Sequence, residues 1–170
     1  AYNDGTHGEG VKIIGCPGVE LRALDLADNR TVGLAVEGSQ TNVDVANVRV
    51  SGTRASDNGG GRGVDVGSDA KAKLAWLHLL QNRRAGLALD GHAVVTLHDG
   101  LIADTMAEQN DDDGGYGVEM WGGATLDLSD VRLHANRDVG LRAGGVGTSV
   151  KGNVCVVDGT LARTSDGTSG

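Results

Sequence analysis

Several residues suited to acid–base chemistry or to sugar binding lie in short alternating segments that each follow a glycine. Glycosidases use two carboxylates about 5 to 9.5 Å apart as acid and base. An exposed indole ring is well suited to stacking on a sugar ring. The sequence therefore predicts catalytic candidates at Asp65, Asp90, Glu119 and Arg142, and substrate-binding candidates at Trp121, Tyr116 and Glu119.

A run of three carboxylates, Asp111-Asp112-Asp113, precedes Gly114 and Gly115. Carboxylates are the hard oxygen ligands that calcium requires. However, adjacent aspartates lack the alternating ligand spacing of an EF-hand and do not readily face one ion. Because charge runs are usually solvated, the sequence favours an acidic turn over a metal site. We expect no required cofactor, with calcium as an optional ligand at this run.

The composition predicts how the core is filled. The chain has 170 residues, with 29 glycines, one proline, no phenylalanine and 2% aromatic residues. Such a core must be built from many small aliphatic layers, which favours a narrow, repetitive architecture. The length fits one domain, residues 1–170.

Charge and hydropathy exclude several classes of partner. The formal net charge is −8, and no cluster of Lys and Arg is evident along the sequence, so nucleic acid is not an expected partner. No apolar run approaches the length of a membrane span. Two cysteines, Cys16 and Cys155, cannot form a disulfide framework.

An internal repeat organises the chain. An Asn, a short turn and a Gly followed by alternating apolar residues recur at residues 29–36, 82–89 and 136–143, with looser copies starting at Asn3, Asn58 and Asn110. Period-two alternation indicates strands with one buried face. A repeat in the twenties, with three short strands in each, predicts one turn of a solenoid and an asparagine ladder at one corner. A helical repeat is disfavoured by the frequent Gly and Asn.

The pattern N-x-x-x-G-φ-x-φ, where φ is apolar, is followed later by segments such as "AVVTLHDGLI" and "ATLDLSDVRL". It resembles the repeat of the pectate-lyase-like superfamily from about Asn3 to Ala162. The resemblance implies an all-β, single-stranded right-handed parallel β-helix of about six coils. That superfamily contains polysaccharide lyases, hydrolases and epimerases, and also phage tailspikes, adhesin passengers and other surface proteins. The polygalacturonase strings "NTD" and "RIK" do not occur in this chain.

Stacking of the repeats predicts which residues share a face. The middle residues of the post-glycine strands would form one outward column, listed along the stack as Lys12, Ala35, Asp65, Ala88, Glu119 and Arg142. A second outward column holds Glu37, Asp90 and Trp121. Longer segments before Asn58 and Asn110 would wall a groove whose floor includes Asp65 and Glu119. In the resembled enzymes a groove along such a face holds the polysaccharide.

Three functions remain open from the sequence. The first is a non-catalytic extracellular or cell-surface module that binds carbohydrate or acts as a structural element. The second is a polysaccharide lyase or glycosidase in the groove. The third is a self-assembling structural or adhesin segment that stacks end to end, because both ends of the chain read as parts of further coils. The expected partners are a polysaccharide or cell-surface glycan, and flanking coils or an end-capping partner. The domain is accordingly expected to be a segment of a longer solenoid.

Overall fold

The computed structural model describes residues 8–56, 59–107 and 114–162, and within these ranges the chain is all-β. Two six-stranded sheets contain only parallel pairs. Sheet A contains β1 (Val11–Ile14), β3 (Val32–Glu37), β7 (Arg62–Gly67), β9 (Ala85–Leu89), β11 (Tyr116–Met120) and β13 (Leu141–Ala143). Sheet B contains β2 (Pro17–Ala27), β4 (Asn42–Ser51), β8 (Lys71–Leu80), β10 (Val94–Ala103), β12 (Thr125–His134) and β14 (Ser149–Asp158). No helix long and apolar enough to cross a membrane occurs in the described ranges.

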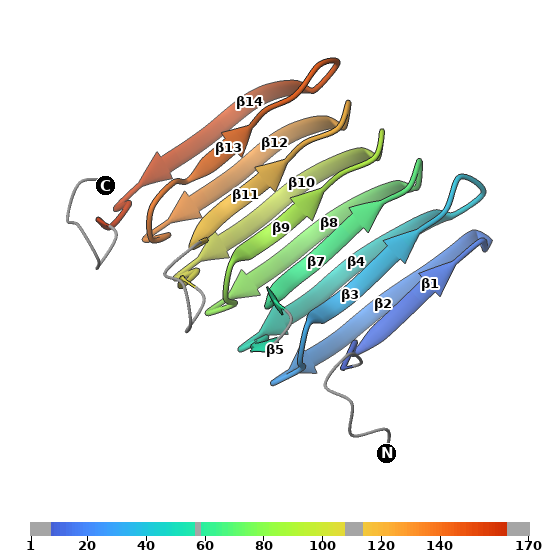
Figure 1. The fold of residues 1–170 in the computed structure, drawn as a ribbon, viewed down its shortest axis with the longest axis horizontal. Coiled ribbons are helices and arrows are strands. Elements are labelled where there is room, and N and C mark those ends of the chain that lie inside the picture. Colours follow the sequence, from blue (N-terminus) through green and yellow to red (C-terminus); the bar gives the residue numbers. More distant parts are fainter. Residues whose placement is uncertain (1–7, 57–58, 108–113, 163–170) are drawn as a thin grey trace.

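The chain alternates between the two sheets, and the strands advance in chain order from β1 and β2 to β13 and β14 (Figure 1). We call one sheet A strand together with the following sheet B strand a rung, which gives six rungs. Neighbouring strands in a sheet lie about 4.8 Å apart. Cys16 in the first rung and Cys155 in the sixth are both free and lie five strand spacings apart.

The core lies between the sheets and is aliphatic. Each central sheet B strand contributes alternating apolar residues to it, as in Val43, Val45, Val48 and Val50 of β4, and sheet A contributes pairs such as Leu34 and Val36. The core cluster contains no aromatic residue. Composition predicted this layered aliphatic packing correctly.

Each sheet B strand bends at a left-handed residue near its middle. The residues with positive φ at this position are Ala23, Asn47, Trp76, Asp99, Asp130 and Val154. The ladder skips them, so that His98 pairs with Ser129 and Gly100 pairs with Val131. The second and third short strands expected from the sequence are therefore one long, bent strand, and each rung contributes two strands rather than three.

The corner before sheet A differs from the asparagine ladder expected from the sequence. Asn82 Nδ2 donates to the Val50 carbonyl at 3.2 Å, and Asn82 Oδ1 accepts from the Thr53 amide at 3.1 Å. Asn136 makes the same two contacts with Ile102 and Thr105. Each asparagine thus bonds to the backbone of the preceding rung, not to another asparagine amide.

Threonine alternates with asparagine at this corner. Backbone hydrogen bonds connect Asn29 with Arg54, Thr53 with Arg83, and Asn82 with Met106, and these bonds align Asn29, Thr53 and Asn82 in one column. Thr105 and Asn136 continue the column. The expected ladder residues Asn3, Asn58 and Asn110 lie outside the described residues, and threonines hold the position in the third and fifth rungs.

The repeat glycine is required by close packing between rungs. A Cβ on Gly86 would lie 2.3 Å from Ile102 Cγ2 and 2.9 Å from the Gly117 carbonyl oxygen. Gly33 and Gly117 face equally close neighbours. Because the backbone of the next rung occupies the Cβ position, glycine recurs here without any positive φ.

Two rungs carry an insertion between the corner threonine and the glycine of sheet A. In the third rung it forms an antiparallel hairpin of β5 (Ala55–Ser56) and β6 (Gly59–Gly60). In the fifth rung, Ala107 and Gly114 form an antiparallel bridge. Gly61 packs against Arg83, and Gly115 packs against Arg137, so each insertion returns to the stack next to the following rung.

Candidate functional site

The alignment predicted for the middle residues of the sheet A strands is confirmed by the strand register. Asp65 pairs with Ala88, Ala88 with Glu119, and Glu119 with Arg142. Lys12 and Ala35 extend the column toward the first rung. Asp65 and Glu119 are consequently two strand spacings apart, about 9.6 Å along the stack.

This face is more covered than the expected open groove. The Glu119 side chain is only 7% exposed, and Ala35 and Ala88 are also buried. Tyr116, a predicted substrate contact, is 1% exposed and forms a small apolar cluster with Ala85, Ala88 and Val139. In this conformation Glu119 and Tyr116 support the surface rather than presenting themselves to a ligand.

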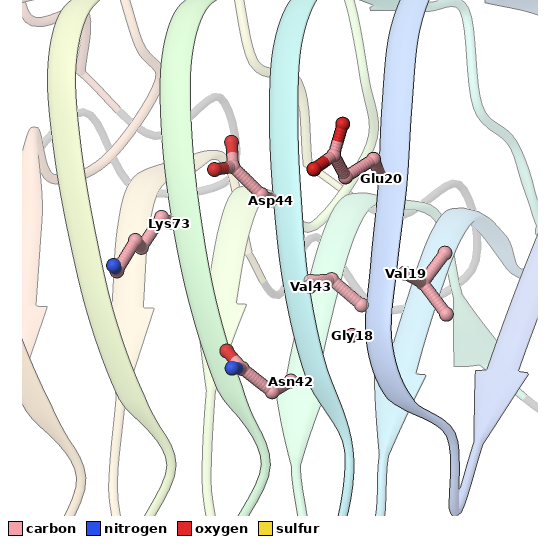
Figure 2. A pocket seen from close by; sticks show the side chains of 7 residues that line it. All are labelled: Gly18, Val19, Glu20, Asn42, Val43, Asp44 and Lys73. Carbon is pink, nitrogen blue, oxygen red and sulfur yellow. The ribbon is translucent and has the colours of Figure 1, made fainter.

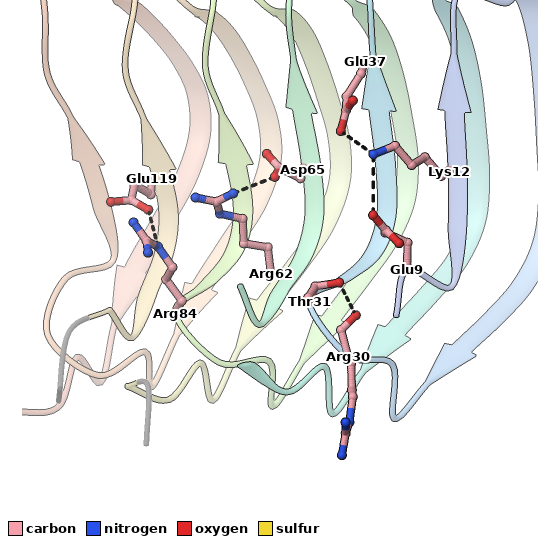
Figure 3. Close-up of polar contacts among 9 residues, drawn as sticks. All are labelled: Glu9, Lys12, Arg30, Thr31, Glu37, Arg62, Asp65, Arg84 and Glu119. Carbon is pink, nitrogen blue, oxygen red and sulfur yellow. Dashed lines mark hydrogen bonds and ion pairs between the residues drawn. The ribbon is translucent and has the colours of Figure 1, made fainter. Parts of the chain in front are cut away.

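Glu119 is surrounded by three donor groups. Its Oε2 lies 3.5 Å from Arg84 Nε, an ion pair that joins neighbouring rungs (Figure 3). Its Oε1 accepts from Trp121 Nε1 at 3.3 Å and lies 4.0 Å from the Arg142 guanidinium. Both carboxylate oxygens are therefore engaged, which compensates for burying a charge.

Arg142 links the two aromatic residues of the site. Its guanidinium carbon lies 4.9 Å from the centre of the Tyr116 ring and 5.0 Å from the centre of the Trp121 ring. It also donates a hydrogen bond to the Tyr116 hydroxyl. Cation–π contacts of this kind are attractive and favour this placement of the guanidinium.

Trp121 is held against the backbone at Gly144, directly after β13. A Cβ on Gly144 would lie 2.0 Å from Trp121 Cζ3, so the ring occupies the space that a side chain there would fill. The indole nitrogen is held by Glu119, and Trp121 remains 39% exposed. The structure thus presents a fixed, partly exposed indole, which we call the Trp121 platform, comprising Trp121, Arg142, Glu119 and Tyr116.

Asp65 lies in a different local environment two strands away. Its Oδ2 accepts from Arg62 at 2.8 Å (Figure 3), and its side chain is 19% exposed. Burial raises the pKa of Asp65 above its ordinary value, while Arg62 opposes this shift and Asp90 adds to it. The carboxyl is therefore harder to ionise than a surface aspartate, although it is paired.

Asp90 lies at the surface just after β9. Its carboxylate occupies the space over Gly67, where a Cβ would lie 2.4 Å from Asp90 Oδ1. Asp90 is exposed, whereas Asp65 and Glu119 are held in ion pairs with Arg62 and Arg84. Asp65 and Glu119, whose separation suits acid–base catalysis, thus both form ion pairs with arginines.

The arginines that neutralise this face were not predicted from the sequence. Arg62 precedes the glycine of β7, and Arg84 lies in the turn before β9. Both arginines lie in the segment between the Asn or Thr and the Gly of a repeat. The residue spacing of the repeat does not show that a long side chain from this segment reaches a neighbouring strand. At the first rung, Lys12 bonds Glu9 and Glu37 in the same way (Figure 3).

Sheet B carries a separate shallow pocket near the first rung. Its volume is about 200 Å³, and Glu20, Asp44 and Lys73 project from three neighbouring strands at its edge (Figure 2). Arg22 pairs with Asp44 at 2.9 Å. None of the residues predicted for catalysis or sugar binding lines this pocket.

The predicted calcium candidates Asp111, Asp112 and Asp113 lie outside the described residues. Within the described part of the chain, no group of three or more His, Cys, Asp or Glu side chains is arranged to hold a metal ion.

Comparison with protein-family models, with curated proteins and with solved structures finds no match for this chain. The resemblance to the pectate-lyase-like superfamily therefore depends on the repeat pattern of the sequence itself.

Proposed function

We propose that this chain is a right-handed parallel β-helix segment that serves as a non-catalytic, extracellular or cell-surface module and binds carbohydrate at the Trp121 platform. The alternation of the chain between two parallel sheets, with one strand per rung in each, supports the β-helix. Flanking coils or an end-capping partner would complete the stack. The ligand class is a polysaccharide or a cell-surface glycan.

One observation carries the binding proposal: Trp121 is fixed on three sides and still 39% exposed. Glu119 holds its nitrogen, the Arg142 guanidinium lies over its ring, and the ring rests on Gly144. An exposed indole normally retains side-chain freedom, which a ligand must remove at an entropic cost. Here that freedom is lost before binding, so stacking on a sugar ring needs little further ordering.

The contacts of the carboxylates favour binding over catalysis. A general acid or base must reach the proton that it transfers, within about 2.6 to 3.2 Å. Glu119 is 7% exposed and bonded on both oxygens, and Asp65 is bonded to Arg62 at 2.8 Å. Neither carboxylate is free to approach a glycosidic oxygen in this arrangement.

The test is a glycan array followed by calorimetry on the best ligand with two matched tryptophan variants. We expect Trp121→Ala to weaken binding by about 10-fold or more, because truncating a tryptophan anchor at a binding site costs about 2 kcal/mol. Trp76→Ala removes the other exposed tryptophan, which is 58% exposed on sheet B, and should bind like the wild type. Equal affinity in the wild type and Trp121→Ala would refute the platform.

A second candidate function is a polysaccharide lyase or glycosidase that uses Asp65, Asp90, Glu119 and Arg142. The raised pKa of Asp65 favours it, because a general acid must retain its proton near the working pH. The separation of Asp65 and Glu119 also reaches the upper end of the range used by inverting enzymes. Depolymerisation that survives in both Asp65→Asn and Glu119→Gln would exclude this site as its source.

A third candidate is end-to-end association. Core-facing Val157 of β14 is 54% exposed, although its partner Leu133 on β12 is buried. An exposed apolar strand edge tends to pair with another strand. A constant sedimentation coefficient from micromolar to millimolar protein would rule this out. Calcium at Asp111, Asp112 and Asp113 is retained as an optional ligand, to be tested by calorimetric titration.

A further inference from the structure

The outer face of sheet B carries a tryptophan at a position that does not suit it. Trp76 occupies the bend of β8 with a φ of 47°, a left-handed conformation that disfavours bulky side chains. The residues at the same bend of the neighbouring strands, Asn47 and Asp99, are of the types that tolerate this conformation. The Trp76 side chain is also 58% exposed, so burial stabilises it little. Neither backbone conformation nor core packing therefore accounts for a tryptophan here.

The surroundings of Trp76 hold the ring and leave space beside it. The rings of Trp76 and His98 meet edge to face with their centres 5.8 Å apart, and His98 bonds Asp99 at 2.9 Å. Ala46 and Ala75 are neighbours in the register just before the bend, and both are buried without belonging to the core cluster. These two small side chains form a low floor next to the indole, where an apolar side chain of a partner would have room to pack.

Three exposed cations flank Trp76. Lys71 and Lys73 precede it on β8. Arg49 on β4 pairs in register with His78, which follows Trp76 by two residues, and both side chains are exposed. Within the described ranges none of these three cations forms an ion pair with a carboxylate. This part of sheet B therefore presents positive charge on a chain whose formal net charge is −8.

The nearest carboxylates do not neutralise these cations. Asp44 is the register neighbour of Lys73, and the two side chains project from adjoining strands (Figure 2). Asp44 nevertheless accepts from Arg22 at 2.9 Å. Asp25 is the register neighbour of Arg49 on β2, and no ion pair joins the two. Lys73 and Arg49 thus keep their charge available for a partner.

We propose that this surface binds an extended acidic peptide segment of a partner protein. We call it the Trp76 patch, and it comprises Arg49, Lys71, Lys73, Trp76 and His78. A strand rises about 3.3 Å per residue, so Lys71 and His78 lie about 23 Å apart along β8, which is the length of about seven extended residues. A short extended peptide can therefore reach the cations on both sides of the indole.

The two kinds of contact would act together. An apolar side chain of the peptide would pack on the indole above Ala46 and Ala75, and Asp or Glu side chains on either side of it would meet the lysines and Arg49. Tryptophan and arginine are the residues that most often anchor protein interfaces. The Trp76 patch lies on sheet B, whereas the Trp121 platform lies on sheet A, so this inference does not depend on carbohydrate binding.

The charge distribution favours a peptide over a bilayer or a nucleic acid. Asp25, Asp44 and Asp99 border the patch, and the whole chain is acidic, so a uniformly anionic surface would be repelled outside the patch. Nucleic acids bind through many phosphate contacts and through several stacked bases, whereas this patch offers three cations and one indole. A peptide with a few acidic residues matches that number of charges.

The test begins with a displayed library of random octapeptides, selected on the wild type and counter-selected on Trp76→Asn. Asparagine holds the equivalent bend of β4, so this variant should fold at least as well as the wild type, which urea denaturation checks. We expect the library to enrich sequences in which Asp or Glu flank an apolar residue. Fluorescence anisotropy of the best labelled peptide should then show binding that weakens as salt rises.

Matched variants separate the patch from general charge effects. Trp76→Asn should weaken binding of that peptide by about 10-fold or more, because it removes the tryptophan anchor. Lys71→Gln combined with Lys73→Gln should weaken it by about 5-fold, since exposed ion pairs contribute modestly. Lys151→Gln removes an exposed lysine from β14, in the same column as Lys73 but three strands away, and should retain wild-type affinity.

Four results would overturn the proposal. The first is a library that enriches no acidic sequences, and the second is an equal loss of affinity in Lys151→Gln and Trp76→Asn. The third is tighter binding of phosphatidylserine vesicles or of oligothymidylate than of the best peptide, which would assign the patch to a bilayer or a nucleic acid. The fourth is a loss of glycan binding in Trp76→Asn, which would make the patch a carbohydrate site. Failure of the Trp121 platform alone would leave peptide binding at the Trp76 patch unchanged.

Discussion

Replacing Asn82 with alanine should destabilise the stack strongly. The Asn82 side chain is fully buried and bridges two rungs through two hydrogen bonds, at 3.1 Å from the Thr53 amide and at 3.2 Å to the Val50 carbonyl. Asn82→Ala removes the acceptor of the Thr53 amide and leaves that amide buried, whereas the Val50 carbonyl stays within the parallel ladder of β4 and β8. A buried unsatisfied group costs about 1–3 kcal/mol, so we expect a loss of about 1–3 kcal/mol in the free energy of unfolding.

The matched control lies at the same corner. Thr53→Val keeps the amide that Asn82 binds and replaces only a buried hydroxyl whose Oγ1 has no hydrogen-bond partner. Removing an unsatisfied polar atom while preserving shape is neutral or stabilising, so we expect the free energy of unfolding to stay constant or rise by about 1 kcal/mol.

Urea denaturation followed by circular dichroism measures both variants. A loss below about 1 kcal/mol in Asn82→Ala would refute the role assigned to the side chain, as would an equal loss in Thr53→Val. If Asn82→Ala does not fold at all, Asn82→Thr supplies the answer, because threonine occupies the same position in alternate rungs. That variant should fold, with a stability between those of the wild type and the alanine variant.

Three further outcomes follow from the structure. Gly86→Ala should lower the free energy of unfolding by about 1–3 kcal/mol, because the new Cβ overlaps Ile102, and a change within 0.5 kcal/mol would show that the rungs separate easily. Burial raises the pKa of Asp65, so its contribution to stability is present at low pH and is lost as the pH rises through the raised pKa. The free energy of unfolding of the wild type, relative to that of Asp65→Asn, should therefore fall as the pH rises above about 3.9. A rise with pH would contradict this assignment. Hydrogen bonding from Arg132 lowers the pKa of Asp158 to about 2, so a carboxyl titration by NMR should show that midpoint, and Arg132→Gln should return it toward about 3.9.

The two insertions leave the stack next to the buried asparagines of the corner. Thr53 and Thr105 precede the insertions, and Asn82 and Asn136 each clamp one of these threonines from the following rung. The two buried asparagine clamps therefore hold the backbone from which the insertions depart. Arg54 follows Thr53 directly and lines a depression at this corner together with Arg83.

The alignment of the proposed site followed directly from the sequence. Alternation after each glycine was enough to place Asp65, Ala88, Glu119 and Arg142 in one column, because a strand has a period of two and a shift of one residue would bury charges in the core. The exposure of that column did not follow. Arg84 reaches Glu119 from another rung, and a long side chain can cover a neighbour without any trace in local spacing.

The sequence by itself determined that this chain forms stacked β-strands with an aliphatic core, because glycine spacing and period-two alternation are local properties. Only the tertiary structure decided what occupies each corner and which charges meet. Arg54 and Arg83 are far apart in the chain yet adjacent in the stack, and the alternation of Thr53 with Asn82 appears only when the rungs are aligned. Such contacts depend on insertion lengths and on the reach of side chains between rungs, which a linear pattern does not contain.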